Sequence, residues 1–153
     1  MPDGGRAIGI LLASEGVDVF ICGLEAKYLE DALADIRDVG KGDGVVIDLA
    51  EPDNVKAVFD QAVAYLGGLG IAVVDAAVFA EGLSDTSKAD LRPAIATDFT
   101  AYLLSAHVAA DKLGDKGDIV LIGSMSAYVR GPNSTIYAGI KYGIQGLLRG
   151  TAA

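Results

Sequence analysis

The amino-acid sequence predicts an α/β fold, in which a doubly wound parallel sheet is covered by helices on both faces. Short apolar runs alternate with longer segments whose apolar residues recur at helical spacing. Hydrophobic residues make up 52% of the chain and aromatic residues only 7%, as expected for buried parallel strands rich in Ala, Val, Ile and Leu. At 153 residues the chain has the size of one domain, so we expect residues 1–153 to form a single core.

The first half of the chain contains two expected strands, each preceded by a helix. Residues 4–16 have a helical pattern that ends at Gly16. The strand VDVFIC at 17–22, a helix at 26–39 and the strand GVVID at 44–48 follow. A buried strand normally comes before the first helix of such a fold. No strand pattern is present there, so we expect this strand to be lacking.

The second half continues the alternation. Pro52 lies in the first turn of a helical pattern, where its missing N–H costs little. The expected elements are a helix at 51–66, a strand with its exit at 71–78, a helix at 94–113 after Pro93, a strand at 118–123 and a helix from Thr135. No strand pattern follows the last helix, so the C-terminal strands of the fold are expected to be lacking as well.

Charge and cysteine content exclude several classes of function. The chain has 12 Lys and Arg against 21 Asp and Glu, and the net charge of -9 repels nucleic acid and anionic membranes. The lone Cys22 allows neither an internal disulfide nor a cysteine zinc cluster. Neither a run of about 18 apolar residues nor a signal peptide is present. We expect a cytoplasmic protein without a metal site, acting on small molecules.

Three polar residues lie where open α/β sheets bind ligands, beyond the carboxyl ends of the strands. Ser124 follows the strand at 118–123, and Tyr137 and Lys141 are four residues apart, so they share one face of the last helix. An ammonium stabilises a nearby phenolate, and a serine hydroxyl can donate to a carbonyl oxygen as negative charge develops on it. This cluster suits proton transfer coupled to hydride transfer, for which a cofactor is needed.

The same residues also fit a purely structural interpretation. Chance alone gives about 0.3 Tyr-x-x-x-Lys pairs in a chain of this composition. Tyr137 and Lys141 are then solvated residues on a helix surface. His107, the only histidine, lies mid-helix, and we expect it to be a packed or interface residue.

Several segments, taken in order, resemble the short-chain dehydrogenase/reductase family. GDIVLIGSMSAYVRGPNSTIYAGIKYGIQG at 117–146 is similar to the family's active-site region. The family's first helix and second strand are similar to RAIGILLASEGVDVFICG, and its third strand is similar to VVIDLAEPDNV. Its Asn-Asn-Ala-Gly strand end is similar to VVDAAV, and the helix with its catalytic asparagine is similar to TDFTAYLLSAHVAA. The resemblance implies a Rossmann-like fold and an NAD(P)-dependent oxidoreductase acting on an alcohol or carbonyl compound.

The resemblance also implies roles for single residues. Tyr137 would be the acid/base, Lys141 would hold the nicotinamide ribose and favour the Tyr137 phenolate, and Ser124 would orient the substrate oxygen. Ser126 suits that role less well, because it lies only eleven residues before Tyr137. The catalytic set is completed by Asp98, at the position of the asparagine. The residues expected to bind the cofactor are Gly5, Asp48, Leu49, Asp75, Ala76, Ala77, Tyr137 and Lys141.

The sequence departs from the family pattern at three places. Of the glycine-rich phosphate turn only DGG is present, with Gly5 in the place of the last glycine. Asp98 replaces the asparagine, either as an acceptor in a proton relay or as a polar residue lining the helix. DAAV replaces Asn-Asn-Ala-Gly, so Asp75 lacks an amide donor and Val78 cannot adopt a glycine-like positive φ. Gly23 and Leu24 leave the choice between NAD and NADP open.

The lacking first strand leaves two strands, 17–22 and 71–78, with unpaired edges. Direct pairing between them, or a strand from another copy, would repair the gap. A competing interpretation of the whole chain is therefore a catalytically inactive fragment of the fold, or a non-catalytic interaction module. In both interpretations we expect a homo-oligomer that associates through the two long helices, as family dimers do.

Overall fold

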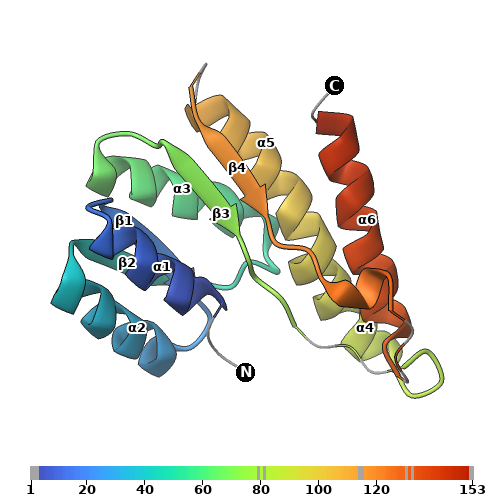
Figure 1. The fold of residues 1–153 in the computed structure, drawn as a ribbon. Helices are drawn as coiled ribbons and strands as arrows, with labels where there is room; N and C mark the ends of the chain where they lie inside the picture. Colours follow the sequence, from blue (N-terminus) through green and yellow to red (C-terminus); the bar gives the residue numbers. More distant parts are fainter. Residues whose placement is uncertain are drawn as a thin grey trace.

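The computed structural model describes residues 4–78, 80, 82–113, 116–129, 131 and 133–151. Within these ranges, strands and helices alternate as the sequence predicts (Figure 1). The strands are β1 (Val19–Gly23), β2 (Gly42–Val46), β3 (Ile71–Val74) and β4 (Asp118–Leu121). The α-helices are α1 (Gly4–Ser14), α2 (Ala26–Val39), α3 (Pro52–Leu66), α4 (Lys88–Ile95), α5 (Ala101–Leu113) and α6 (Thr135–Thr151).

The strands form two separate parallel pairs, β1 with β2 and β3 with β4. In the first pair Val19 lies opposite Gly42, and in the second Ile71 lies opposite Asp118. In the described part of the chain no strand joins β1 to β3, as expected for a fold that lacks its first strand. Direct pairing between these two strands, which was one way to close the gap, does not occur.

The hydrogen bonds of β1 show which of its backbone groups lack a strand partner. The N–H of Val19 donates to the carbonyl of Lys41 at 3.0 Å, and the carbonyl of Gly23 accepts from Ile47 at 2.9 Å. Alternate residues of a strand direct their backbone groups to opposite edges, so Phe20 and Cys22 point theirs away from β2. Among the described residues, no strand pairs with that edge.

Each strand pair has its own hydrophobic core. Val74, Tyr102, Leu121 and Ile144 bring β3, α5, β4 and α6 together. Ala13, Val19 and Ile36 do the same for α1, β1 and α2. Helix α3 packs against α5 and also contacts β1, and thereby links the two halves. The ammonium of Lys112 on α5 supports this link, because it binds the Asp60 carboxylate on α3 at 2.6 Å.

Close approach of α1 and α2 depends on one glycine. Gly40 ends α2, and a Cβ at this position would lie 2.5 Å from the carbonyl oxygen of Ala13 at the end of α1. Such a contact is far inside van der Waals distance, so a larger residue would push the two helices apart.

The expected helix at 94–113 is wrong at its start. Helix α4 begins earlier, at Lys88, because Ser87 and Asp90 form a capping box. Pro93 lies inside α4, and a π-helical turn, η1 (Ala96–Thr100), connects it to α5. Among the described residues, none of the helices is both long enough and apolar enough to cross a bilayer.

Candidate active site

The candidate active site lies beyond the carboxyl ends of β3 and β4. A short 3₁₀ turn, η2 (Met125–Ala127), follows β4 and packs against α6 (Figure 1). Ser124 precedes this turn and caps it, because its side-chain oxygen accepts the N–H of Ser126 at 3.1 Å. The turn after β4 thus contacts α6, the helix that carries Tyr137 and Lys141. The convergence of Ser124 with Tyr137 stays a prediction.

Lys141 is the buried centre of the site. Its side chain is on α6, and only 1% of the residue is exposed. The ammonium donates to the hydroxyl of Tyr102 at 2.9 Å and to the carbonyl oxygen of Ile122 at 3.4 Å. The interpretation of Lys141 as a solvated residue on a helix surface is therefore wrong.

Tyr137 shares a helix face with Lys141, as the i, i+4 spacing predicts. The Lys141 Nζ atom lies 5.7 Å from the centre of the half-buried Tyr137 ring. A positive charge at this distance from an aromatic ring is attracted by the ring electrons. The geometry is compatible with an acid/base role for Tyr137, which stays a prediction.

Asp98 is fully buried in η1. Its Oδ1 atom accepts the N–H of Val78 at 2.6 Å, which ties η1 to the segment after β3. Its Oδ2 atom has no hydrogen-bond partner in the described part of the chain. Burial raises the pKa of the Asp98 carboxyl, and the Val78 N–H and the charge of Lys141 oppose this rise.

The ionisable groups around Lys141 influence one another through space. Burial lowers the pKa of Lys141, and the carboxylates of Asp98 and Asp75 oppose this change. Burial raises the pKa of Tyr102, and the negative charges of Asp75 and Asp98 raise it further. Tyr102 therefore remains a neutral phenol at physiological pH, able to donate one hydrogen bond and accept others.

Asp75 lies at the N-terminus of α1. Its carboxylate accepts a hydrogen bond from the backbone N–H of Gly5, and a Cβ on Gly4 would lie only 2.7 Å from its Oδ2 atom. Burial raises the pKa of Asp75, and the charge of Lys141 and the Gly5 N–H oppose this. The chain thus places its own negative charge where helix amides favour an anion.

The residues predicted for the adenine end lie in two segments. Asp48 is exposed after β2, and its Oδ1 atom accepts the N–H of Ala50 at 2.8 Å. Leu49 is half-buried beside it. Ala76 is half-buried and Ala77 is exposed directly after Asp75. Their predicted roles in cofactor binding stay predictions.

A nicotinamide dinucleotide fits this residue set at one end better than at the other. The Lys141 ammonium has three N–H groups, of which Tyr102 and Ile122 use two, so one is left for a ribose hydroxyl. At the phosphate end, the backbone N–H groups of α1 can bind an anion, but the Gly5 N–H already donates to the Asp75 carboxylate. The diphosphate would have to displace this carboxylate or tolerate its charge.

Tyr102 is the residue of this site that the sequence analysis missed. It is fully buried on α5, and its hydroxyl donates to the carbonyl of Ile122 at 3.2 Å while accepting from Lys141. The available signal was its position four residues after Asp98, which places both on one helix face. A tyrosine in an apolar helix pattern is usually interpreted as a core residue. Tyr102 is indeed part of the hydrophobic core, in addition to its contact with Lys141.

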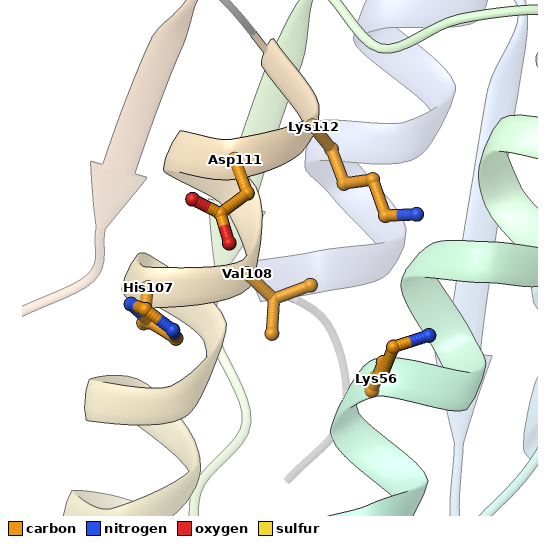
Figure 2. A pocket seen from close by; sticks show the side chains of 5 residues that line it. All are labelled: Lys56, His107, Val108, Asp111 and Lys112. Atoms are coloured by element: carbon orange, nitrogen blue, oxygen red, sulfur yellow. The ribbon is translucent and has the colours of Figure 1, made fainter.

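A hollow lies between α3 and α5, and none of the candidate site residues lines it. Figure 2 shows that His107, Val108, Asp111 and Lys112 line it from α5 and Lys56 from α3. His107 is exposed, so it is not packed in the core of the chain, and its expected role as an interface residue stays a prediction. Within the described ranges, no group of three or more His, Cys, Asp or Glu side chains is placed to bind a metal ion.

The sequence matches a family model described as Enoyl-(Acyl carrier protein) reductase over residues 5–153. A curated relative, the short chain dehydrogenase/reductase dpchG of Colletotrichum higginsianum, is 30% identical over 97% of this chain. The chain spans 58% of the length of that relative.

Solved structures show the same fold. A variant of a short-chain dehydrogenase/reductase from Serratia marcescens is 30% identical, with a TM-score of 0.90, over 97% of this chain and 62% of its own. A short chain dehydrogenase from Burkholderia cenocepacia, in complex with NADP, is 29% identical, with a TM-score of 0.88, over 97% of this chain and 63% of its own. The Rossmann-like arrangement predicted from the sequence is confirmed.

Proposed function

We propose, because the chain belongs to the short-chain dehydrogenase/reductase family, that it is an NAD(P)-dependent oxidoreductase interconverting an alcohol and a carbonyl compound. The observation that supports this most directly is the burial of the Lys141 ammonium within 5.7 Å of the Tyr137 ring, beside the end of β4. A buried charge is costly unless its surroundings compensate for it. Such a placement is typical of a functional site rather than of a helix surface.

In the direction of reduction, the side chains handle the substrate oxygen. The Tyr137 hydroxyl donates its proton to that oxygen, and the Ser124 hydroxyl donates a hydrogen bond to it while negative charge develops. The Lys141 charge stabilises the phenolate that remains on Tyr137. A nicotinamide, when bound, would supply the hydride for the carbonyl carbon. Asp98 serves as a buried acceptor in the relay that returns a proton to Tyr137.

The proposed cofactor site follows the ends of β2 and β3. Lys141 would hold the nicotinamide ribose through its remaining N–H, and Asp75, Ala76 and Ala77 would pass the adenine ribose. Asp48 and Leu49 would bind the adenine, and the Gly5 amide would face the phosphates. The cofactor is NAD or NADP, since Gly23 at the end of β1 and Leu24 after it offer neither the acidic nor the basic side chain that selects between them.

The second candidate function is a non-catalytic module of the same fold. The position of Asp75 favours it, because a carboxylate on the Gly5 N–H competes with a phosphate group for the α1 amides. In this case the chain would associate with other copies without binding a dinucleotide. In both cases we propose a homo-oligomer formed through α5 and α6.

Replacement of Tyr137 by Phe tests the proposed reaction. The variant should lose at least about a hundredfold in turnover of a panel of small ketones and alcohols, because a positioned acid/base contributes that much or more. The affinity for NADPH should remain within about twofold, since a purely catalytic loss leaves ground-state binding unchanged. Turnover is followed by nicotinamide absorbance, and binding by nicotinamide fluorescence.

Tyr28→Phe is the matched control, because Tyr28 is an exposed tyrosine on α2. It should leave both turnover and affinity unchanged. An equal loss of turnover and NADPH affinity in Tyr137→Phe would argue against the acid/base role.

A further inference from the structure

Tyr102 contacts Lys141 but has no part in the reaction proposed above. We propose that Tyr102 is a positioning residue that holds the Lys141 ammonium beside Tyr137 and thereby affects proton transfer through Lys141. The effect of Tyr102 on proton transfer rests on the proposed function. The anchoring itself is a property of the cofactor-free chain, and it can be measured without turnover.

The contact forms a closed set of three groups. The Tyr102 hydroxyl donates to the Ile122 carbonyl at 3.2 Å, and the Lys141 ammonium donates to both, at 2.9 Å to the hydroxyl and 3.4 Å to the carbonyl. A carbonyl oxygen only accepts, so the phenol proton points to Ile122 and a lone pair of the phenol oxygen faces the ammonium. The arrangement suits a protonated Lys141, whose N–H groups donate to two oxygens.

The aromatic ring adds a second attraction. The Lys141 Nζ atom lies 4.4 Å from the centre of the Tyr102 ring, which is closer than its 5.7 Å from the Tyr137 ring. A cation within about 6 Å of a ring centre is attracted by the ring electrons, more strongly when both are desolvated. Tyr102 is 0% exposed and Lys141 is 1% exposed. The ammonium therefore lies near two tyrosine rings, and the Tyr102 ring is the nearer one.

Other ionisable groups face Lys141 without a hydrogen bond to its ammonium. Asp75 follows β3, Asp98 is in η1 and Tyr137 is on α6, and the two carboxylates act on Lys141 through their charge. In the described part of the chain, the hydrogen bonds of Lys141 go to Tyr102 and Ile122. The carboxylates thus favour the charged state of Lys141, whereas Tyr102 determines where the charge lies.

An anchor matters because a lysine side chain is long and flexible. Without a buried partner, a four-carbon stem tends to extend its ammonium towards water. Tyr102→Phe removes the hydroxyl and keeps the ring, so it deletes the hydrogen bond with little change in packing. The cation–ring attraction and the nearby carboxylates are retained in this variant.

The test uses NMR of the cofactor-free chain with ¹³C at lysine Cε and tyrosine Cζ. Loss of a hydrogen bond to a charged group should lower the pKa of Lys141 in Tyr102→Phe by about one pH unit. Tyr28→Phe, which removes an exposed hydroxyl on α2, should leave the Lys141 titration unchanged. An unchanged midpoint in Tyr102→Phe would overturn the proposal.

The unmodified chain provides a second measurement if Tyr102→Phe does not fold. The Cζ signal of Tyr102 should shift at the pH at which the Cε signal of Lys141 shows that the amine loses its proton. Signals that change at unrelated pH values would also overturn the proposal.

Activity measurements separate this proposal from the proposed function. In a chain that turns over, Tyr102→Phe should lower kcat about tenfold and shift its pH profile, with a smaller change in NADPH affinity. A chain that binds no NADPH rejects the proposed function, while the Lys141 titration still decides the role of Tyr102. If the chain turns over but the Lys141 titration does not depend on Tyr102, only the proposed role of Tyr102 is rejected.

Discussion

At the scale of single residues, two buried carboxylates determine the charge of the site. Asp75 and Asp98 both have pKa values raised by burial, although Lys141 lies nearby. For an acid, a raised folded-state pKa means that the folded chain binds more protons than the unfolded chain between the two pKa values. Folding stability therefore rises as the pH falls from neutral through the raised pKa towards the ordinary value near 4.

Replacement of Asp98 by Asn tests this charge effect. At pH 7 the variant should be more stable than the unmodified chain, by about 1 kcal/mol or about 3 °C in Tm, because it removes a charge whose Oδ2 lacks a partner. The advantage should shrink as the pH approaches 4, where the native carboxyl is neutral. Thermal unfolding followed by circular dichroism at several pH values measures both effects.

Asp31→Asn is the matched control for that comparison. Asp31 is exposed on α2, so its replacement should change Tm by less than about 1 °C at every pH. A Tm of Asp98→Asn that falls below that of the unmodified chain at pH 7 would show that the Asp98 charge stabilises the fold.

At the scale of elements, two anions compete for the N-terminus of α1, the Asp75 carboxylate and the phosphate group of a cofactor. Gly4 and Gly5 are the first two residues of this helix, and the Gly5 N–H donates to the Asp75 carboxylate. The amides at a helix N-terminus favour one anion, and two anions at this end repel each other. The state of Asp75 therefore affects how well α1 can hold a phosphate.

Replacement of Asp75 by Asn should strengthen NADPH binding. Removal of the negative charge is expected to lower Kd about fivefold, which corresponds to about 1 kcal/mol. Titration followed by nicotinamide fluorescence measures Kd for the variant, the unmodified chain and Asp31→Asn. Weaker binding by Asp75→Asn would mean that the carboxylate itself contacts the cofactor favourably.

The order of the elements could be predicted from the sequence, but the start of α4 and the role of Tyr102 could not. Strands and helices differ in the period of their apolar residues, which is visible along the chain. Ser87 and Asp90 signal a helix start, yet Pro93, six residues after Ser87, suggested a boundary instead. The contact between Tyr102 and Lys141 joins residues 39 apart in sequence, so only the packing of α5 against α6 reveals it.

At the scale of the whole molecule, the two strand pairs have edges without a strand partner in the described residues. An isolated two-stranded sheet is marginally stable, so helices must supply most of the stability of each half. Helix α3 contacts both β1 and α5 and is the main link between the halves. The separation of the described strands into two pairs could not be read from the sequence, because it depends on which strands lie side by side in the folded chain.

Hydrogen exchange of β1 amides tests this description within one strand. The N–H of Val19 is bonded to Lys41, whereas the N–H groups of Phe20 and Cys22 point away from β2. The amides of Phe20 and Cys22 should exchange at least about tenfold faster than that of Val19 in D₂O. NMR measures each rate, with Val19 as the internal control. Equal protection would show that another strand covers this edge.

The proposed function requires that the face of Lys141 and Tyr137 binds a nicotinamide dinucleotide. The most direct measurement is a titration of the unmodified chain with NADPH and with NADH, followed by the fluorescence of the bound nicotinamide. We predict saturable binding of at least one of them below about 1 mM, which corresponds to about 4 kcal/mol, and weaker binding by Lys141→Met. Binding of neither cofactor at millimolar concentration, by a chain that is shown to be folded, would contradict the account.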